Sequence, residues 1–280
     1  IKAQDDYRST VKRLYYNNFM KQVSDWCRKN NIIYTGHFGG EEELAGHIFQ
    51  GDMMEELMLF DMPGIDSIIS SLKIETNEFN IAGKLGASAA KFMGSDRLLC
   101  ETYTGSGWSI RLPDMKRIAN RLLMLGVNMI QYMGAYYSIA GTNKNFPQCY
   151  APSHSYNNTL FPYYNKLGNY IAAFSSLSAA TKPDNNVLVF NPLRQMEHDY
   201  YMFVRDKAYG AFDAFPQRTY TDTLNALLYE AIGYDLFSEN LIDNITVYDD
   251  YIEAYNYRYD TVVFPRMHYI NTATKELIEK

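Results

Sequence analysis

A glutamate, Glu101, stands at the end of a short apolar run, Arg97 to Glu101, that is typical of a buried strand. The residues after it, Thr102 to Trp108, include two glycines, which allow the backbone to fold over a cleft. In α/β barrels, polar residues at the carboxyl ends of the strands face the active site. Glu101 is therefore predicted to be a general base or a nucleophile. The alternative is a carboxylate satisfied by a nearby arginine or by loop amides, but a charge directly after a buried strand favours the catalytic interpretation.

A second polar group follows an earlier predicted strand, in the segment Y-T-G-H-F-G-G-E-E-E that begins at Tyr34. If the two strands are parallel, His37 and one of the glutamates reach the same face as the first carboxylate. His37 is then placed to bind a sugar hydroxyl or to tune an acid, and Glu41 or Glu42 to act as catalytic acid or substrate ligand. The H-E-x-x-H spacing of a zinc helix is absent. Enrichment of acids at a helix N-terminus is the alternative for Glu42 and Glu43.

Further substrate-binding candidates lie near the other strand ends. Asp66 closes the segment M-P-G-I-D and either reaches the cleft or caps a helix. The remaining candidates offer an amide, hydroxyls and aromatic faces that suit a sugar platform, with ordinary core or surface roles as the alternative. They are Trp108, Gln131, Tyr132, Tyr136 and Tyr137.

The elements that position these residues alternate between helix and strand. Apolar residues recur at three- and four-residue spacing from Asp5 to Asn30, which predicts a long amphipathic helix. Its apolar stripe consists of Val11, Leu14, Tyr15, Phe19, Val23 and Trp26. Strands are predicted to begin near Ile32, Ile65, Arg97 and Val127. Helices are predicted at 81–93, from Pro113 to a stop at Gly126, and through Leu167, Tyr170, Ile171, Phe174 and Leu177.

The spacing of these strands matches the length of one unit in a (β/α)₈ barrel of about 250 residues. Four such units make half a barrel, and a parallel sheet with helices on one side only leaves its other face exposed. Either the other strands lie upstream of this sequence or the sheet is doubly wound, and the pattern favours the first. We expect residues 1–182 to form the second half of a TIM-barrel catalytic domain.

A polar linker, Lys182 to Asn186, separates this region from a second α/β pattern in residues 183–280. Strands are predicted at Val187 to Phe190, Asp235 to Phe237 and Thr261 to Phe264, with a helix closed by Gly233 and another from about Thr272 to the last residue. This is the opening of a doubly wound domain that we expect to be incomplete. No G-x-G-x-x-G follows its first strand, so nucleotide binding has no support.

Composition excludes several classes of function. The net charge is −6 and the basic residues are scattered, which argues against a nucleic-acid partner. No apolar run approaches the roughly 18 residues of a membrane span. The three cysteines form neither a metal-ligand spacing nor a disulfide framework. Because the sequence does not begin with Met, we expect the natural N-terminus to lie upstream, and both cytoplasmic and exported locations stay open.

Hydrolysis of a glycoside usually requires two carboxyl groups, a proton donor and a nucleophile or base. Glu101 is the clear candidate for one of them, and the missing part of the barrel is the natural place for another. A non-catalytic carbohydrate-binding or scaffold protein on the same barrel is the alternative. An amidotransferase or esterase centred on Cys100 or Ser88 lacks a G-x-S-x-G elbow or a Cys-His arrangement.

Five segments together carry a family resemblance: D-W-C-R-K-N-N-I-I-Y-T-G-H-F-G-G-E-E, M-P-G-I-D, K-L-G-A-S-A-A-K-F-M-G, L-L-C-E-T-Y-T-G-S-G-W and L-G-V-N-M-I-Q-Y-M-G-A-Y-Y-S. They resemble bacterial glycoside hydrolases of the α-L-rhamnosidase type, family 106 and its unclassified relatives. The resemblance implies a barrel followed by a flavodoxin-like, glutamine-amidotransferase-like domain, activity on a plant or microbial polysaccharide or glycoconjugate, and Glu101 as base or nucleophile. It also implies a calcium ion near the sugar. G-A-Y-Y-S departs from the rhamnosidase pattern, in which a His is usual, so the residues support a glycosidase better than a rhamnosidase.

Overall fold

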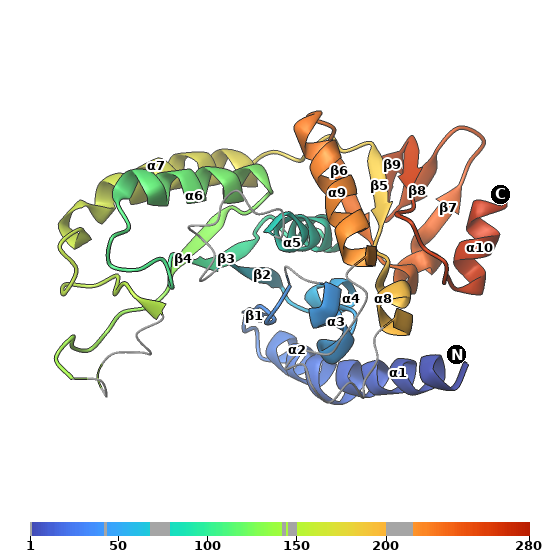
Figure 1. Ribbon diagram of the computed structural model, residues 1–280, viewed down its shortest axis with the longest axis horizontal. Helices are drawn as coiled ribbons and strands as arrows, with labels where there is room; N and C mark the ends of the chain where they lie inside the picture. Colours follow the sequence, from blue (N-terminus) through green and yellow to red (C-terminus); the bar gives the residue numbers. More distant parts are fainter. Residues whose placement is uncertain (1, 42–43, 68–78, 142–143, 145–149, 200–214) are drawn as a thin grey trace.

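The computed structural model describes residues 2–41, 44–67, 79–141, 144, 150–199 and 215–280, and it is a mixed α/β protein with two parallel sheets (Figure 1). Glu42, one of the predicted ligands, and Cys149 lie outside these residues. In the described part of the chain, no helix is both long and apolar enough to cross a membrane.

The first sheet contains the four predicted strands in chain order, all parallel. They are β1 (Thr35–Gly36), β2 (Met62–Ser67), β3 (Leu99–Thr102) and β4 (Met129–Tyr132). β1 begins later than predicted, because Ile32 and Ile33 are exposed and the Ile32 N–H donates to the Cys27 carbonyl of the preceding helix. β2 begins earlier than predicted, at Met62, and Pro63 is tolerated there since β1 is a short neighbour. The predicted parallel order is confirmed.

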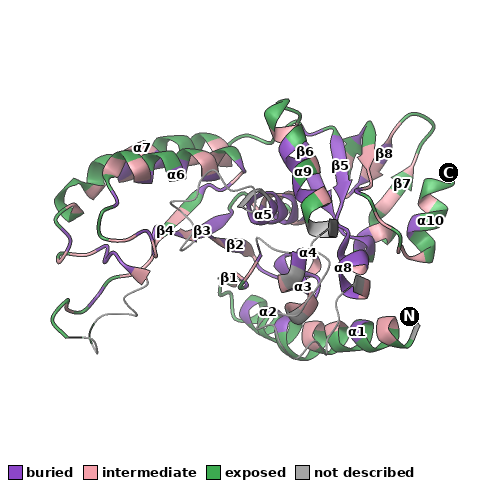
Figure 2. Cartoon of the chain, in the orientation of Figure 1, coloured by how far each residue is buried: buried purple, intermediate pink, exposed green. Residues whose placement is uncertain are grey.

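Helix α5 (Phe79–Met93) lies at the centre of the molecule and is buried along most of its length (Figure 2). Gly86 is the reason that it approaches the first sheet closely. A Cβ at this position would lie 2.7 Å from Leu98 and 2.9 Å from Ile65. The predicted helix-to-sheet packing of this small-residue stretch is therefore confirmed. α6 (Leu112–Met124) and α7 (Tyr164–Ala179) cover β3 and β4 and pack on each other. The predicted stripe of α7 is buried only at Leu167 and Ile171, while Phe174 and Leu177 are exposed.

The predicted N-terminal helix is present as α1 (Lys2–Tyr15), a π-helical turn η1 (Tyr16–Met20) and α2 (Lys21–Lys29). Apart from Tyr15, its apolar stripe does not face the core. Leu14, Phe19 and Trp26 are 52%, 54% and 58% exposed, while Met20 and Cys27 on the other side are buried. Periodicity identified the helix correctly, but of this stripe only Tyr15 packs against the core formed by the described residues.

The second unit is built on a parallel sheet in the order β10-β5-β6, with β5 at Val187–Phe190, β6 at Tyr234–Phe237 and β10 at Thr261–Val263. α8 (Leu193–Asp199) and α9 (Phe215–Tyr229) lie between β5 and β6 in the chain. An antiparallel sheet that the sequence analysis missed is formed by three-residue strands, which are too short to show a period. These strands are β7 (Ile245–Val247), β8 (Ile252–Ala254) and β9 (Tyr257–Tyr259). The last helix, α10 (Thr272–Ile278), ends before the last residue.

A buried polar network joins α5 to the second unit. Asp235 of β6 is paired with Lys91 of α5 at 2.5 Å and accepts hydrogen bonds from Asn185 at 2.7 Å and Tyr259 at 2.8 Å. The hydroxyl of Ser88 accepts the Leu236 N–H at 2.8 Å and donates to the Lys84 carbonyl. α5 thus contributes to the packing of both parallel sheets.

Candidate functional site

Three polar residues stand side by side at the carboxyl ends of the strands in the first sheet. Asp66 of β2 is in register with Glu101 of β3, which is in register with Gln131 of β4. Side chains at one register position in neighbouring parallel strands point to the same face. The sheet therefore aligns two predicted carboxylates and the predicted amide in one row.

His37, which directly follows β1, joins this row through Glu101. Its Nε2 lies 2.8 Å from Glu101 Oε2, and its Nδ1 lies 2.6 Å from the Phe38 carbonyl oxygen. Since both partners accept hydrogen bonds, both ring nitrogens donate and the ring is an imidazolium. Glu41, the Phe38 carbonyl and Glu101 raise the pKa of His37 to about 10, against the opposing effect of burial.

Two further carboxylates surround the same imidazolium. Glu41 Oε1 lies 3.5 Å from His37 Nδ1 and accepts the Phe38 N–H at 2.7 Å, and Asp66 Oδ2 lies 3.9 Å from the same nitrogen. The Glu41 side chain is fully buried, whereas those of Asp66 and Glu101 are 14% and 20% exposed. Glu41 is thus placed to hold the loop and the ring, and Glu101 and Asp66 are the carboxylates with access to solvent.

Glu101 keeps one oxygen available for chemistry. Its Oε2 accepts the His37 hydrogen bond, and within the described residues its Oε1 has no hydrogen bond. Cys100 beside it is fully buried, and burial raises the pKa of its thiol. Ser88 is engaged with Lys84 and Leu236 in packing. Neither residue has the setting of an activated nucleophile.

Some of the predicted aromatic ligands are exposed at the surface, and others are packed in the core. The Trp108 ring is 52% exposed and meets Tyr136 edge-on at a centroid distance of 6.1 Å, and Tyr137 is also exposed. Trp108 also borders a hollow of about 330 Å³ with Arg111 and Ile139. Tyr132 instead packs into the core next to Tyr103, with its hydroxyl buried. Trp108 and Tyr137 are therefore better placed than Tyr132 to contact a ligand.

The sequence analysis did not single out His154, which lies behind β4. Its Nδ1 is 2.9 Å from the Tyr164 hydroxyl, and its ring meets that of Tyr132 edge-on. Burial lowers the pKa of His154 to about 4, so the ring is neutral at physiological pH. A lone histidine in the segment A-P-S-H-S-Y carries no spacing signal, so only the fold brings it to the end of β4.

The calcium ion implied by the family resemblance does not fit the residues gathered here. In the described part of the chain, one group could hold a metal: His37, Glu41 and Asp66, whose ligand atoms lie within 4.8 Å of one another. Ca²⁺ takes about six to eight oxygen ligands. This group offers two carboxylates and an imidazolium whose nitrogens both donate hydrogen bonds. We therefore assign no metal to these residues.

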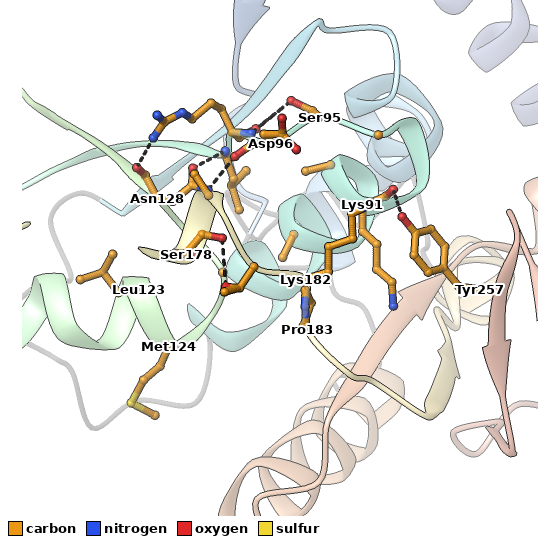
Figure 3. A pocket seen from close by; sticks show the side chains of 18 residues that line it. Lys91, Ser95, Asp96, Leu123, Met124, Asn128, Ser178, Lys182, Pro183 and Tyr257 are labelled. Carbon is orange, nitrogen blue, oxygen red and sulfur yellow. Dashed lines mark hydrogen bonds between the residues drawn. The ribbon is translucent and has the colours of Figure 1, made fainter. Parts of the chain in front are cut away.

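A separate cavity of about 250 Å³ opens at the amino ends of β3 and β4, where the second unit meets the first (Figure 3). Lys91, Asn128, Lys182 and Tyr257 are among its lining residues, and the Tyr257 hydroxyl donates to the Lys91 carbonyl at 3.3 Å. The cavity lies at the opposite end of the strands from Glu101. It is therefore not part of the candidate active site.

Comparison with known proteins gives a likeness in fold. The chain matches no protein-family model and no curated protein sequence. Among solved structures it is similar to a rhamnosidase from Novosphingobium sp. PP1Y, with a TM-score of 0.67 and 18% sequence identity over 98% of this chain. The chain spans 25% of the length of that protein. The likeness shows that this α/β chain has the fold of part of a rhamnosidase.

Proposed function

We propose that this chain carries part of the active site of a glycoside hydrolase, with Glu101 as its nucleophile or base. One observation carries the proposal: Glu101 is a solvent-accessible carboxylate at the carboxyl end of a parallel strand, in register with Asp66 and Gln131 and paired with the His37 imidazolium. Glycoside cleavage passes through a positively charged, oxocarbenium-like transition state. A fixed carboxylate stabilises that charge or attacks the anomeric carbon.

In this proposal His37 orients Glu101 and does not itself react. Its hydrogen bond to Oε2 leaves Oε1 pointing to substrate, and Glu41 and the Phe38 carbonyl keep the ring protonated. Gln131, Trp108 and Tyr137 would bind sugar hydroxyls and ring faces, whereas Tyr136, predicted to do the same, is only 6% exposed and packs edge-on against the Trp108 ring. Asp66 or a residue outside this sequence would supply the acid, because Glu41, the other predicted acid, is fully buried and accepts the Phe38 N–H. The distance between acid and base would decide whether the product retains or inverts its configuration.

We further propose that residues 1–182 are the second half of a (β/α)₈ barrel and that residues 183–280 are the start of a flavodoxin-like domain. β1 is an edge strand, and a hollow of about 390 Å³ beside it is lined by Tyr15, Phe19, Tyr34 and His37. The exposed stripe of α1 and α2 borders the same edge. Further parallel strands with their helices would pair with β1 and cover these apolar side chains.

The test is hydrolysis of a panel of aryl glycosides by the protein that contains this chain. α-L-Rhamnoside is the first substrate, because the similar structure is that of a rhamnosidase, and β-galactoside is included. Glu101→Gln should reduce kcat/KM by about 10³-fold or more, while the exposed Glu276→Gln serves as a matched control and retains full activity. Equal activity of the wild type and Glu101→Gln would exclude this mechanism. Sugar binding without hydrolysis in the wild type would favour the carbohydrate-binding alternative.

A further inference from the structure

A second group of carboxyl groups lies far from the sheet edge, in a cavity of about 420 Å³ between α1, α4 (Met53–Leu57) and α8. Asp52, Glu55 and Glu56 line one side of it. Lys12 of α1 and Glu197 of α8 lie on its other sides. No residue of the first sheet is among its lining residues, so it is independent of the Glu101 site.

Among the described residues, three cations line this cavity, and two of them, Lys12 and Arg194, are engaged with other acids, while Arg13 of α1 is the third. Lys12 is paired with Glu197, and Arg194 Nε lies 3.4 Å from Glu239. Asp52 also has partners, because its carboxylate accepts hydrogen bonds from Ser238, from Asn240 at 2.8 Å and from the backbone N–H of Met54 at 3.2 Å. By contrast, within the described residues the side chains of Glu55 and Glu56 have no hydrogen bond or ion pair.

Among these carboxyl groups, Glu56 is buried most deeply without a hydrogen-bond partner in the described part of the chain. The residue is 1% exposed, and its Oε2 is buried without a partner among the described residues. Gly51 makes room for the carboxyl, since a Cβ at that glycine would lie 2.3 Å from Glu56 Oε1. A buried polar oxygen without a hydrogen-bond partner destabilises the fold. A ligand that brought a donor to Glu56 would remove this cost.

We propose that this cavity binds a small organic amine, whose ammonium group donates hydrogen bonds to Glu55 and Glu56. An ammonium carries three donors and a positive charge, and these are what the two carboxyl groups lack. A bare metal ion fits less well, since in the described part of the chain Asp52, Glu55 and Glu56 do not bring three ligand atoms within 4.8 Å. The Tyr16 ring and the Asn17 and Asn240 side chains also line the cavity and can contact the rest of the ligand.

Binding of an ammonium should release protons. Burial and the charge of Asp52 raise the pKa of Glu55 to about 7 and of Glu56 to about 9. At pH 7.5 Glu56 therefore carries a proton in the free protein. The ammonium favours the ionised carboxylate, so this proton leaves when the amine binds.

Other titratable groups also lie near Glu55 and Glu56. Lys12 and Arg13 of α1 and Arg194 and Glu197 of α8 face the cavity with Tyr16. Burial lowers the pKa of the neighbouring His47 to about 4, so it is neutral at pH 7.5. Glu56 is therefore the main expected source of the released proton.

The experiment is isothermal titration calorimetry with 1,4-diaminobutane at pH 7.5, in two buffers of different ionisation enthalpy. We expect saturable binding with release of close to one proton, and no binding of the neutral isostere 1,4-butanediol. Glu56→Gln should abolish the proton release, and Glu55→Gln combined with Glu56→Gln should weaken binding by about tenfold or more. Glu276→Gln should change neither.

Several outcomes would overturn the proposal. They are no binding of the diamine to the wild type, equal binding of the diol, unchanged affinity in the folded double variant, or displacement of the diamine by calcium chloride at equal concentration. Glu56→Gln replaces a carboxyl by an amide of the same shape, so circular dichroism should show that the variants are folded. If the double variant did not fold, the single Glu56→Gln variant would decide through its proton release.

Discussion

Two clusters of three carboxyl groups in this chain differ in whether a cation lies among them. At the sheet edge, Glu41, Asp66 and Glu101 surround the His37 imidazolium. In the cavity beside α1, the cluster consists of Asp52, Glu55 and Glu56. No cation forms an ion pair with Glu55 or Glu56 within the described residues, because Lys12, whose charge acts on both from a distance, pairs with Glu197.

The difference teaches that a central cation decides what a buried carboxyl cluster can do. Around His37 the acids keep the ring charged, and Glu101 accepts one hydrogen bond from it and has its other oxygen available. Around Glu56, burial and the charges of Asp52 and Glu55 raise the pKa of the acid to about 9 against the smaller effect of Lys12, and the group is protonated until a partner arrives. The first cluster is arranged for reaction, and the second for binding a positive charge.

Removing the cation from the first cluster should have the largest effect. His37→Gln keeps a donor for Glu101 but loses the positive charge among three carboxylates. We expect kcat/KM on the best aryl glycoside to fall by about 100-fold, with KM changing less than kcat. A His37→Gln variant with wild-type activity would show that the cation is not needed to prepare Glu101.

Removing the uncompensated charge from the second cluster should stabilise the protein. The folded pKa of Glu56 is about 9, above the ordinary value of 4.5, so the wild type loses stability as pH rises from 4.5 to 9. Glu56→Gln lacks this loss, and we expect it to be more stable than the wild type by about 1–3 kcal/mol at pH 9. Urea unfolding at pH 5 and pH 9 measures the difference. Equal pH dependence of the two proteins would contradict the assignment.

Removing one carboxylate from the first cluster while keeping its cation should reduce activity less. Glu41→Gln removes the largest contribution to the raised pKa of His37. We expect the alkaline limb of the pH–rate profile to move toward neutral pH and kcat at pH 7 to fall by about tenfold at most. A loss of activity with an unchanged profile would indicate a purely structural role.

The stability that the imidazolium contributes should be the smallest of these effects. Because the folded pKa of His37 is raised to about 10, its contribution is fully present below pH 6.5 and is lost as pH rises through about 10. The His37 side chain is 26% exposed, so solvent screens part of the interaction. Between pH 6.5 and 10 the wild type should therefore lose about 1 kcal/mol more than His37→Gln, as measured by urea unfolding.

Much of the first cluster could be predicted from the sequence because each of its residues follows an apolar strand. Parallel strands bring their carboxyl ends together, so His37 and Glu101 were expected on one face, and they meet there. Asp66 was left open between the cleft and a helix cap, and it lies beside Glu101 in the sheet. Register added the information that the sequence lacked, namely that Asp66, Glu101 and Gln131 form one row.

The second cluster could not be predicted in the same way. Asp52, Glu55 and Glu56 stand in the segment G-D-M-M-E-E, which has the charge of a solvated helix start. They are buried only because α1 and α8, distant in the chain, meet over them. The exposed stripe of α1 and α2 was unpredictable for a related reason, since periodicity defines an apolar face but not the element that covers it.

The polar linker at Lys182 to Asn186 separates two units in the sequence. These units are not expected to fold independently, because both pack on helix α5. The helix lies against β2 on one side and β6 on the other. Close packing at Gly86 joins it to β2, and Lys91 and Ser88 bond it to Asp235 and Leu236 of β6. A chain cut at the linker would therefore leave the second unit without one wall of its core and the first with a buried lysine unpaired. The two units should therefore unfold in one cooperative transition. Replacement of either unit by an unrelated domain would also require a change in the residues of α5.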